Sequence, residues 1–114
     1  FPSDGINGRL FVDKIVNFIN RAGDSFNTIW VSDHLTPWTA GVSESLDTLE
    51  CWTAVSYLIG VFPNRRFGTA VLCNSFRSPA LLAKMAASLD ELSSGRFTLG
   101  IGAGWRESEY LAYG

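Results

Sequence analysis

The sequence predicts an α/β fold built on a parallel sheet, and three observations favour it. Segments with the apolar spacing of amphipathic helices alternate along the chain with short runs rich in β-branched and aromatic residues. Each of three such runs is followed by a polar or glycine-rich loop, and then by another helical segment. Strands that alternate with helices in this way lie parallel in one sheet, because each helix carries the chain back to the sheet's starting edge.

The first helix is expected over residues 9–21. Its buried face would be formed by apolar residues at every third or fourth position, namely Phe11, Ile15, Phe18 and Ala22. Gly23 is placed to end this helix in the left-handed conformation. The run 26–32 (FNTIWVS) then predicts the first strand. Residues 33–45 contain a proline and a glycine among polar residues and predict a loop.

A second helix is expected to begin at Ser43 or Ser45, either of which could cap it, and to end at Phe62. Its apolar side would carry Leu46, Leu49, Trp52 and Ile59. The second strand is predicted over 66–72 (RFGTAVL).

The third helix is expected to begin at Ser78-Pro79, a capping hydroxyl followed by proline at the first helical position. It would end at 93–95, with a buried stripe of Leu82, Met85, Leu89 and Leu92.

Residues 97–114 (FTLGIGAGWRESEYLAYG) contain the third predicted strand, three alternating glycines and the start of a fourth helix at Trp105. Glycine at a strand's carboxyl end removes the Cβ atoms that would keep a flat ligand away from the backbone. Ligands of parallel α/β folds bind at that end of the sheet. Because residue 105 is Trp, the dinucleotide fingerprint G-x-G-x-x-G fails at its third glycine, and classical dinucleotide binding is weakly supported.

Composition excludes several classes of protein. A net charge of -2 gives no electrostatic footprint for nucleic acid, and no run of eighteen apolar residues exists to span a membrane. No signal peptide is visible, so a cytoplasmic location is expected. Cys51 and Cys73 are expected as reduced thiols rather than a disulfide. The 114 residues are interpreted as one domain (1–114) and as a piece of a longer protein, since a complete eight-fold barrel needs about 250 residues.

Asp33 and His34 follow the first predicted strand and are the main candidates for chemistry. His34 is the only histidine and could transfer a proton beside a bound ring, with Asp33 bonding to it or to the ligand and Trp38 walling the pocket. The alternative is structural, with an aspartate that caps a turn and a histidine that bonds the loop backbone. The spacing leaves both interpretations open.

Other polar residues have structural explanations as well. Arg77 precedes the third helix, where an anion could bind, but pairing with a neighbouring carboxylate is the better-supported prediction. Cys73 could be a nucleophile only beside a base, so a buried thiol is expected. Glu107 and Glu109 suit the positive end of the fourth helix. No cluster of residues has metal-ligand spacing, so no metal site is expected.

Three stretches together resemble the luciferase-like monooxygenase superfamily. They are WVSDHLTPW, GTAVLCNSFRSPALLAKMAASLDELSSGRFTLGIGAGW and ESEYLAYG, and they cover most of the chain from Phe26 onward. The closest branch looks like the bacterial oxidoreductases that depend on the deazaflavin coenzyme F420. The resemblance implies part of a TIM (β/α)8 barrel, about strands two to four with their flanking helices, and a flavin or deazaflavin at the carboxyl rim.

The resemblance also implies roles for particular residues. Asp33 and His34 match a pair brought to the cofactor ring, with His34 as the acid or base. Trp38 matches an active-site Trp of some deazaflavin dehydrogenases. The cofactor ring would lie near a non-proline cis peptide at about Ala70-Val71. Further cofactor contacts and a pocket wall would come from Ala103, Gly104 and Trp105. Trp105 stands where some dehydrogenase members have a glutamate, which puts a proton donor at that position in doubt.

The function implied is hydride transfer through bound F420, with FMN as the alternative cofactor. The partners implied are a small-molecule substrate and NAD(P)H or a flavin reductase, with no nucleic acid and no membrane. Uncovered strand edges and helix faces predict a homo-oligomer. Three other interpretations stay open: a non-catalytic flavin-binding or interaction module, an inactive fragment of the enzyme, and another barrel enzyme with a different cofactor.

Overall fold

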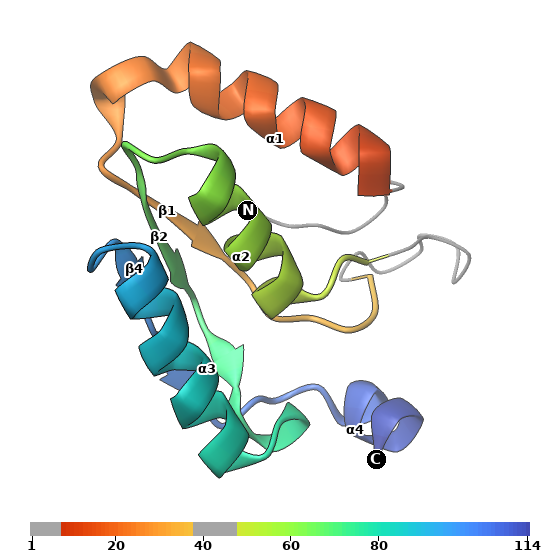
Figure 1. The fold of residues 1–114 in the computed structure, drawn as a ribbon. Helices are drawn as coiled ribbons and strands as arrows, with labels where there is room; N and C mark the ends of the chain where they lie inside the picture. The colour runs from red at the N-terminus through yellow and green to blue at the C-terminus, as the bar shows by residue number, and fades with distance from the viewer. Residues whose placement is uncertain (1–7, 38–47) are drawn as a thin grey trace.

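A computed structural model describes residues 8–37 and 48–114 of the chain. Helices and strands alternate as the sequence predicts (Figure 1). Two short 3-10 turns, Gly23–Ser25 and Asn74–Phe76, follow the first helix and the third strand. The helices are α1 (Gly8–Ala22), α2 (Cys51–Val61), α3 (Pro79–Leu92) and α4 (Glu107–Tyr113), and the strands are β1 (Thr28–Val31), β2 (Arg66–Thr69), β3 (Leu72–Cys73), β4 (Phe97–Thr98) and β5 (Ile101–Gly102).

The described strands form two parallel ladders, which confirms the predicted fold class. One ladder has the order β1-β2-β4, and the other pairs β3 with β5. Within each ladder, neighbouring strands follow one another in chain order, and a helix lies in each crossover: α2 between β1 and β2, and α3 between β2 and β4 and between β3 and β5. Winding in a single direction is found both in a barrel and in one half of a doubly wound sheet, whose order reverses only at its switch point. The carboxyl ends of the strands therefore share one edge, and α4 lies beyond that edge (Figure 1).

The second predicted strand is interrupted where β2 passes into β3. Phe67 pairs with Phe97, thirty positions later, but Leu72 pairs with Ile101, only twenty-nine positions later. One extra residue is therefore accommodated between β2 and β3, as in a β-bulge. The Thr69 hydroxyl fills the gap in the ladder, because it donates to the Gly100 carbonyl at 2.8 Å and accepts from the Gly100 amide at 3.1 Å.

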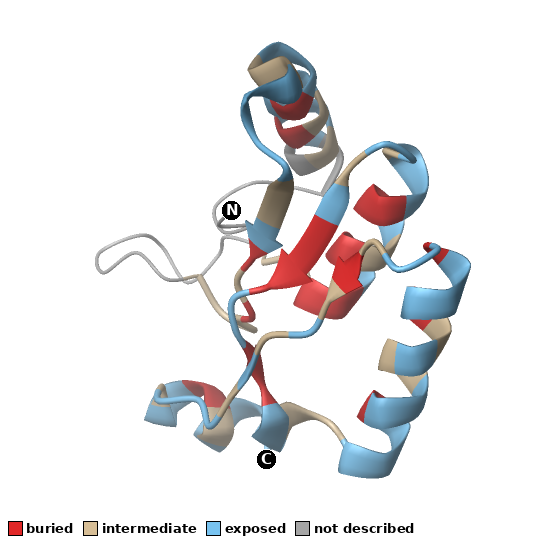
Figure 2. Ribbon diagram, turned by 90° about the vertical axis from the view of Figure 1, so that its left-hand side faces the viewer, coloured by how far each residue is buried: buried red, intermediate tan, exposed pale blue. Residues whose placement is uncertain are grey.

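The core lies between the strands and α2. Phe67 of β2 is fully buried, and Trp52 of α2 packs edge-on against Phe97 of β4 with ring centroids 5.4 Å apart. Burying a side chain the size of Phe67 contributes roughly 1.5–3 kcal/mol. Ile15 and Ile19 bring α1 into the same cluster. Figure 2 shows the buried residues gathered on the central strand and on α2.

Two helix starts differ from the predictions. The N-cap of α2 is Glu50, whose carboxylate accepts hydrogen bonds from the amides of Trp52 and Thr53 at 2.8 and 2.7 Å. The helix thus begins several residues later than predicted, and Ser43 and Ser45 lie outside the described residues. α3 does begin at Ser78-Pro79, but the Ser78 hydroxyl makes no capping hydrogen bond.

Two predicted core positions are also wrong. Phe18 is 48% exposed and Leu92 is 83% exposed, whereas Ile15 and Ile19 of α1 and Leu82 and Leu89 of α3 are buried. The apolar stripe of each helix is wider than the contact that the neighbouring elements offer. Of the other predicted α1 positions, the side chain of Phe11 is outside the described part.

Arg96, just before β4, closes the turn between α2 and β2. Its guanidinium donates to the carbonyls of Ile59, Phe62 and Arg65 at 3.0, 2.9 and 2.7 Å. The last carbonyls of a helix have no partner within the helix, so Arg96 satisfies the Ile59 carbonyl at the end of α2, which would otherwise need water. The Phe62 carbonyl also accepts from the Arg65 amide at 3.1 Å. Within the described ranges, no helix is long and apolar enough to cross a membrane.

Candidate active site

Three segments that leave the carboxyl ends of the strands line one cavity of about 350 Å³. The first segment follows β1, the second runs through the bulge between β2 and β3, and the third follows β5. Every predicted site residue within the described part of the chain borders this cavity: Asp33, His34, Ala70, Val71, Ala103, Gly104 and Trp105. The remaining predicted residue, Trp38, lies outside the described residues. The convergence predicted from the sequence is therefore present, while the assignment of these residues to a cofactor stays a prediction.

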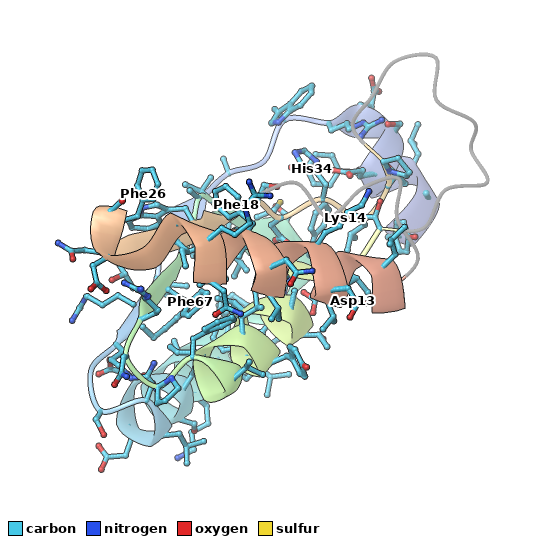
Figure 3. All side chains as sticks on the ribbon, turned by 90° about the horizontal axis from the view of Figure 1, so that it is seen from above. Asp13, Lys14, Phe18, Phe26, His34 and Phe67 are labelled. Carbon is cyan, nitrogen blue, oxygen red and sulfur yellow. The ribbon has the colours of Figure 1, made fainter. Side chains whose placement is uncertain are left out.

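His34 is held by a glutamate from the far end of the chain. Its Nδ1 lies 3.2 Å from each carboxylate oxygen of Glu109, which belongs to α4. The Glu109 side chain is 2% exposed and that of His34 is 14% exposed. In Figure 3, His34 lies beside α4 at the end of β1. A buried carboxylate against an imidazole is an arrangement that can stabilise a positive charge on the ring.

Glu109 also fixes the loop that carries His34. Its Oε1 accepts hydrogen bonds from the amides of Leu35 and Thr36, at 2.9 and 3.1 Å, and from the Thr36 hydroxyl at 3.1 Å. Burial alone would raise the pKa of Glu109, but the bonds from Thr36, His34 and Leu35 outweigh it, and the net pKa lies below the usual 4.5. The carboxylate is therefore ionised at neutral pH.

Asp33 takes part in a buried ion pair beneath the cavity. Its oxygens accept from Arg77 at 2.7 and 3.0 Å, and Oδ2 also accepts from the Cys73 amide at 2.8 Å. Arg77 bonds Glu50 as well, so it joins the end of β1 to the start of α2. The prediction that Arg77 pairs with neighbouring carboxylates is confirmed. These contacts raise the pKa of Arg77 despite its burial.

The bulge and the glycines shape the floor of the cavity. The Ala70-Val71 peptide is cis, at the place that the resemblance indicates, and the Val71 side chain is 51% exposed. Gly104 has φ +79°, and a Cβ there would collide with the hydroxyl of Tyr110 and the Sγ of Cys73. The chain's own packing therefore requires glycine at 104, in addition to any approach by a ligand.

Trp105 forms a wall of the cavity. It is 69% exposed, and its ring stands edge-on to the His34 imidazole at 6.0 Å between centroids. Tyr110 also borders the cavity; its hydroxyl donates to the Ala103 carbonyl at 2.9 Å and lies 3.4 Å from the Cys73 Sγ. Cys51 and Cys73 are both free and buried, as predicted.

Sequence reasoning assigned Glu109 only to the helix dipole and did not single out Tyr110. Glu109 meets His34 across 75 positions of the chain, and no local pattern marks such a contact. The one available signal was that α4 begins at the same rim as His34. Within the described segments, no group of His, Cys, Asp and Glu side chains could hold a metal ion.

A second cavity, of about 200 Å³, lies between α1 and the start of β1. Phe18, Phe26 and Trp30 line it, and its one charged residue, Arg65, pairs with Asp24 at 3.1 Å. In Figure 3, Phe26 lies at the far end of α1 from Asp13 and apart from His34. Its lining offers no carboxylate, histidine or cysteine, so it is not the candidate active site.

A parallel sheet with a cavity at its carboxyl edge is the arrangement of α/β enzymes, and comparison with known proteins identifies the family. The family model described as luciferase-like monooxygenase matches residues 13–114. The chain belongs to that family.

Relatives with assigned activities include an F420-dependent hydroxymycolic acid dehydrogenase from Mycobacterium tuberculosis, 36% identical over 102 residues. An F420-dependent glucose-6-phosphate dehydrogenase from Amycolatopsis mediterranei is 32% identical over 102 residues. Each alignment covers 88% of this chain, but only 28% and 30% of the two relatives. The chain thus spans less than a third of the length of these curated relatives.

A solved structure shares the fold. It is the oxygenating constituent of 3,6-diketocamphane monooxygenase from Pseudomonas putida, a type II Baeyer-Villiger monooxygenase in complex with FMN. The TM-score is 0.68 at 24% identity, over 96% of this chain and 29% of that one. The described elements are therefore part of a (β/α)8 barrel.

Proposed function

We propose that this chain forms part of the cofactor site of an oxidoreductase that transfers hydride through a bound deazaflavin, coenzyme F420, with FMN as the alternative. The observation that carries the proposal is the convergence of three loops on one cavity, where a histidine is held by a buried carboxylate. The F420-dependent relatives support the deazaflavin, and the FMN complex of the structural neighbour supports the alternative.

The residues present fit a flat ring system. Val71 and Trp105 offer exposed apolar surface on the cavity, and Ala103 and Gly104 offer backbone with little or no side chain. The binding sites of cofactors are largely apolar, with a few polar groups that fix orientation. His34 supplies the titratable group, and Asp33 would act through the Cys73 amide and Arg77 that it holds.

The chain's own residues would manage protons and exclude water. When bound, the deazaflavin or flavin supplies the hydride acceptor or donor. For an alcohol substrate, the carbon–hydrogen bond gives up a hydride while His34 accepts the hydroxyl proton, leaving a carbonyl product; the reverse reaction returns both. Glu109 would stabilise the imidazolium that forms. The names of the relatives, both dehydrogenases, support an alcohol or its carbonyl product as the substrate class.

Cofactor titration tests the proposal. Coenzyme F420 and FMN are each titrated into the purified chain while their fluorescence is followed. Saturable binding is expected, and Val71→Asp should weaken it at least tenfold, because the new charge would face an apolar ring. The matched control is Leu92→Ala, on exposed α3 surface outside the cavity, which should leave binding unchanged.

Absence of saturable binding by both cofactors, or equal affinity in Val71→Asp, would refute the proposal. The tighter of the two ligands identifies the cofactor. Binding without reduction by alcohol donors would instead favour the non-catalytic flavin-binding module. A cytoplasmic location, a homo-oligomeric state and a nicotinamide or reductase partner stay predictions.

A further inference from the structure

The two oxygens of the Glu109 carboxylate have different neighbours. Oε1 receives the loop donors, which are the amides of Leu35 and Thr36 and the Thr36 hydroxyl. Oε2 has only His34 as a neighbour among the contacts found in the described part of the chain. Both oxygens therefore contact the imidazole ring, and Oε1 also accepts from the loop that carries His34.

An ionised carboxylate accepts hydrogen bonds and donates none. Since Nδ1 of His34 lies 3.2 Å from both oxygens of Glu109, Nδ1 must carry the hydrogen in this contact. Arg106 reinforces the negative charge, with its Nη1 3.8 Å from Oε1, while also donating to the Pro37 carbonyl at 2.9 Å. The other ring nitrogen, Nε2, is then the one whose protonation changes.

We propose that Glu109 is a positioning residue that holds His34 in the Nδ1–H tautomer and so makes Nε2 the nitrogen that exchanges a proton with substrate. The role in the reaction rests on the function proposed above, but the tautomer does not. An unconstrained imidazole in water favours the opposite, Nε2–H tautomer, so the protein would be selecting the minor form. The tautomer sets which ring nitrogen carries the hydrogen and which one is able to accept a proton.

Nitrogen-15 NMR of the chain tests the tautomer directly. His34 is the only histidine, so its two ring nitrogens can be assigned without ambiguity. Above the pH at which the imidazole loses its proton, the wild type should show a pyrrole-type signal for Nδ1 and a pyridine-type signal for Nε2. A pyrrole-type Nε2 in the folded wild type would overturn the proposal.

Glu109→Gln provides the matched perturbation. The amide oxygen of Gln can still accept from Leu35 and Thr36, but its NH2 group would donate toward Nδ1 and so favour the Nε2–H tautomer. The control is Glu107→Gln, the same chemical change at an exposed position of α4, which should keep the wild-type pattern. A purely structural role predicts that Glu109→Gln leaves the tautomer unchanged, and that result would refute the proposal.

Added coenzyme F420 separates the two proposals. If both hold, the ligand should shift the Nε2 signal of wild-type His34 more than the Nδ1 signal. An Nδ1–H tautomer with no response to F420 or FMN would refute the cofactor site and leave the role of Glu109 in selecting the tautomer. A shift confined to Nδ1 would refute the assignment of Nε2 as the exchanging nitrogen.

Discussion

The buried pair of Asp33 and Arg77 gives the sharpest quantitative prediction. The Asp33 side chain is 0% exposed and that of Arg77 is 12% exposed, and the two form a bidentate contact at 2.7 and 3.0 Å. Removing one partner of a buried pair costs about 3–5 kcal/mol, because the other charge is left without compensation. Asp33→Asn should lie near the lower limit, since Arg77 keeps Glu50 as a partner. The loss in the free energy of unfolding for Arg77→Met should lie nearer the upper limit, because it leaves the buried Asp33 carboxylate without its cation.

The double variant isolates the interaction. Asp33→Asn combined with Arg77→Met removes both charges, so its cost should fall below the sum of the single costs by about 1–3 kcal/mol. Urea denaturation followed by circular dichroism gives each free energy of unfolding. Asp24→Asn is the control, because Asp24 is fully exposed in its pair with Arg65 and should contribute nothing measurable. Additive single costs, or a loss below about 1 kcal/mol for Arg77→Met, would refute the reasoning.

Three further predictions concern packing and the thiols. Gly104→Ala should destabilise by about 2 kcal/mol or more in urea denaturation, and by more than Gly95→Ala, because both glycines have positive φ but only at 104 would a Cβ collide, with Tyr110. Phe67→Ala should cost about 3–5 kcal/mol with a lower Tm, and a loss under 1 kcal/mol would contradict its central place in the core. Burial, helped by nearby carboxylates, raises the pKa of Cys51 from 9.0 to about 12, so iodoacetamide at pH 9.5 should label it only in unfolded protein, as mass spectrometry would show. The pKa of Cys51 is higher in the folded than in the unfolded protein, so burial of the protonated thiol stabilises the fold fully below pH 9, and this stabilisation is lost as the pH rises toward 12. In Cys51→Ala, the free energy of unfolding should therefore fall less over that pH range.

Local sequence patterns were sufficient for the order of elements and for the rim. Short apolar runs rich in β-branched and aromatic residues located β1, β2 and β4, and the parallel arrangement then placed Asp33, His34 and the residues around 104 at one edge. That the carboxyl ends of parallel strands share one edge follows from strand direction alone, and the alternation of helices and strands gives that direction. The cis peptide came from resemblance alone, since no local pattern in the residues requires it.

Contacts between distant segments could not be predicted. The contact of Glu109 with His34 joins positions 75 apart, and Glu50 caps α2 with a longer side chain than the usual serine, threonine or aspartate. The exposure of Leu92 was also missed, because helical periodicity shows which residues share a face but not how much of that face a neighbour covers.

The three carbonyls gathered by Arg96 bear on the order in which this part of the chain becomes structured. The turn that leads from α2 into β2 depends on a donor 31 to 37 positions further along, so it gains its full set of bonds only when β4 arrives. Sequential strand–helix units could otherwise assemble one at a time, from near neighbours only. Because the Arg96 guanidinium must be in place before the turn from α2 to β2 has all its hydrogen bonds, α2 and β2 are fully stabilised only together with β4. This dependence favours cooperative assembly of α2, β2 and β4.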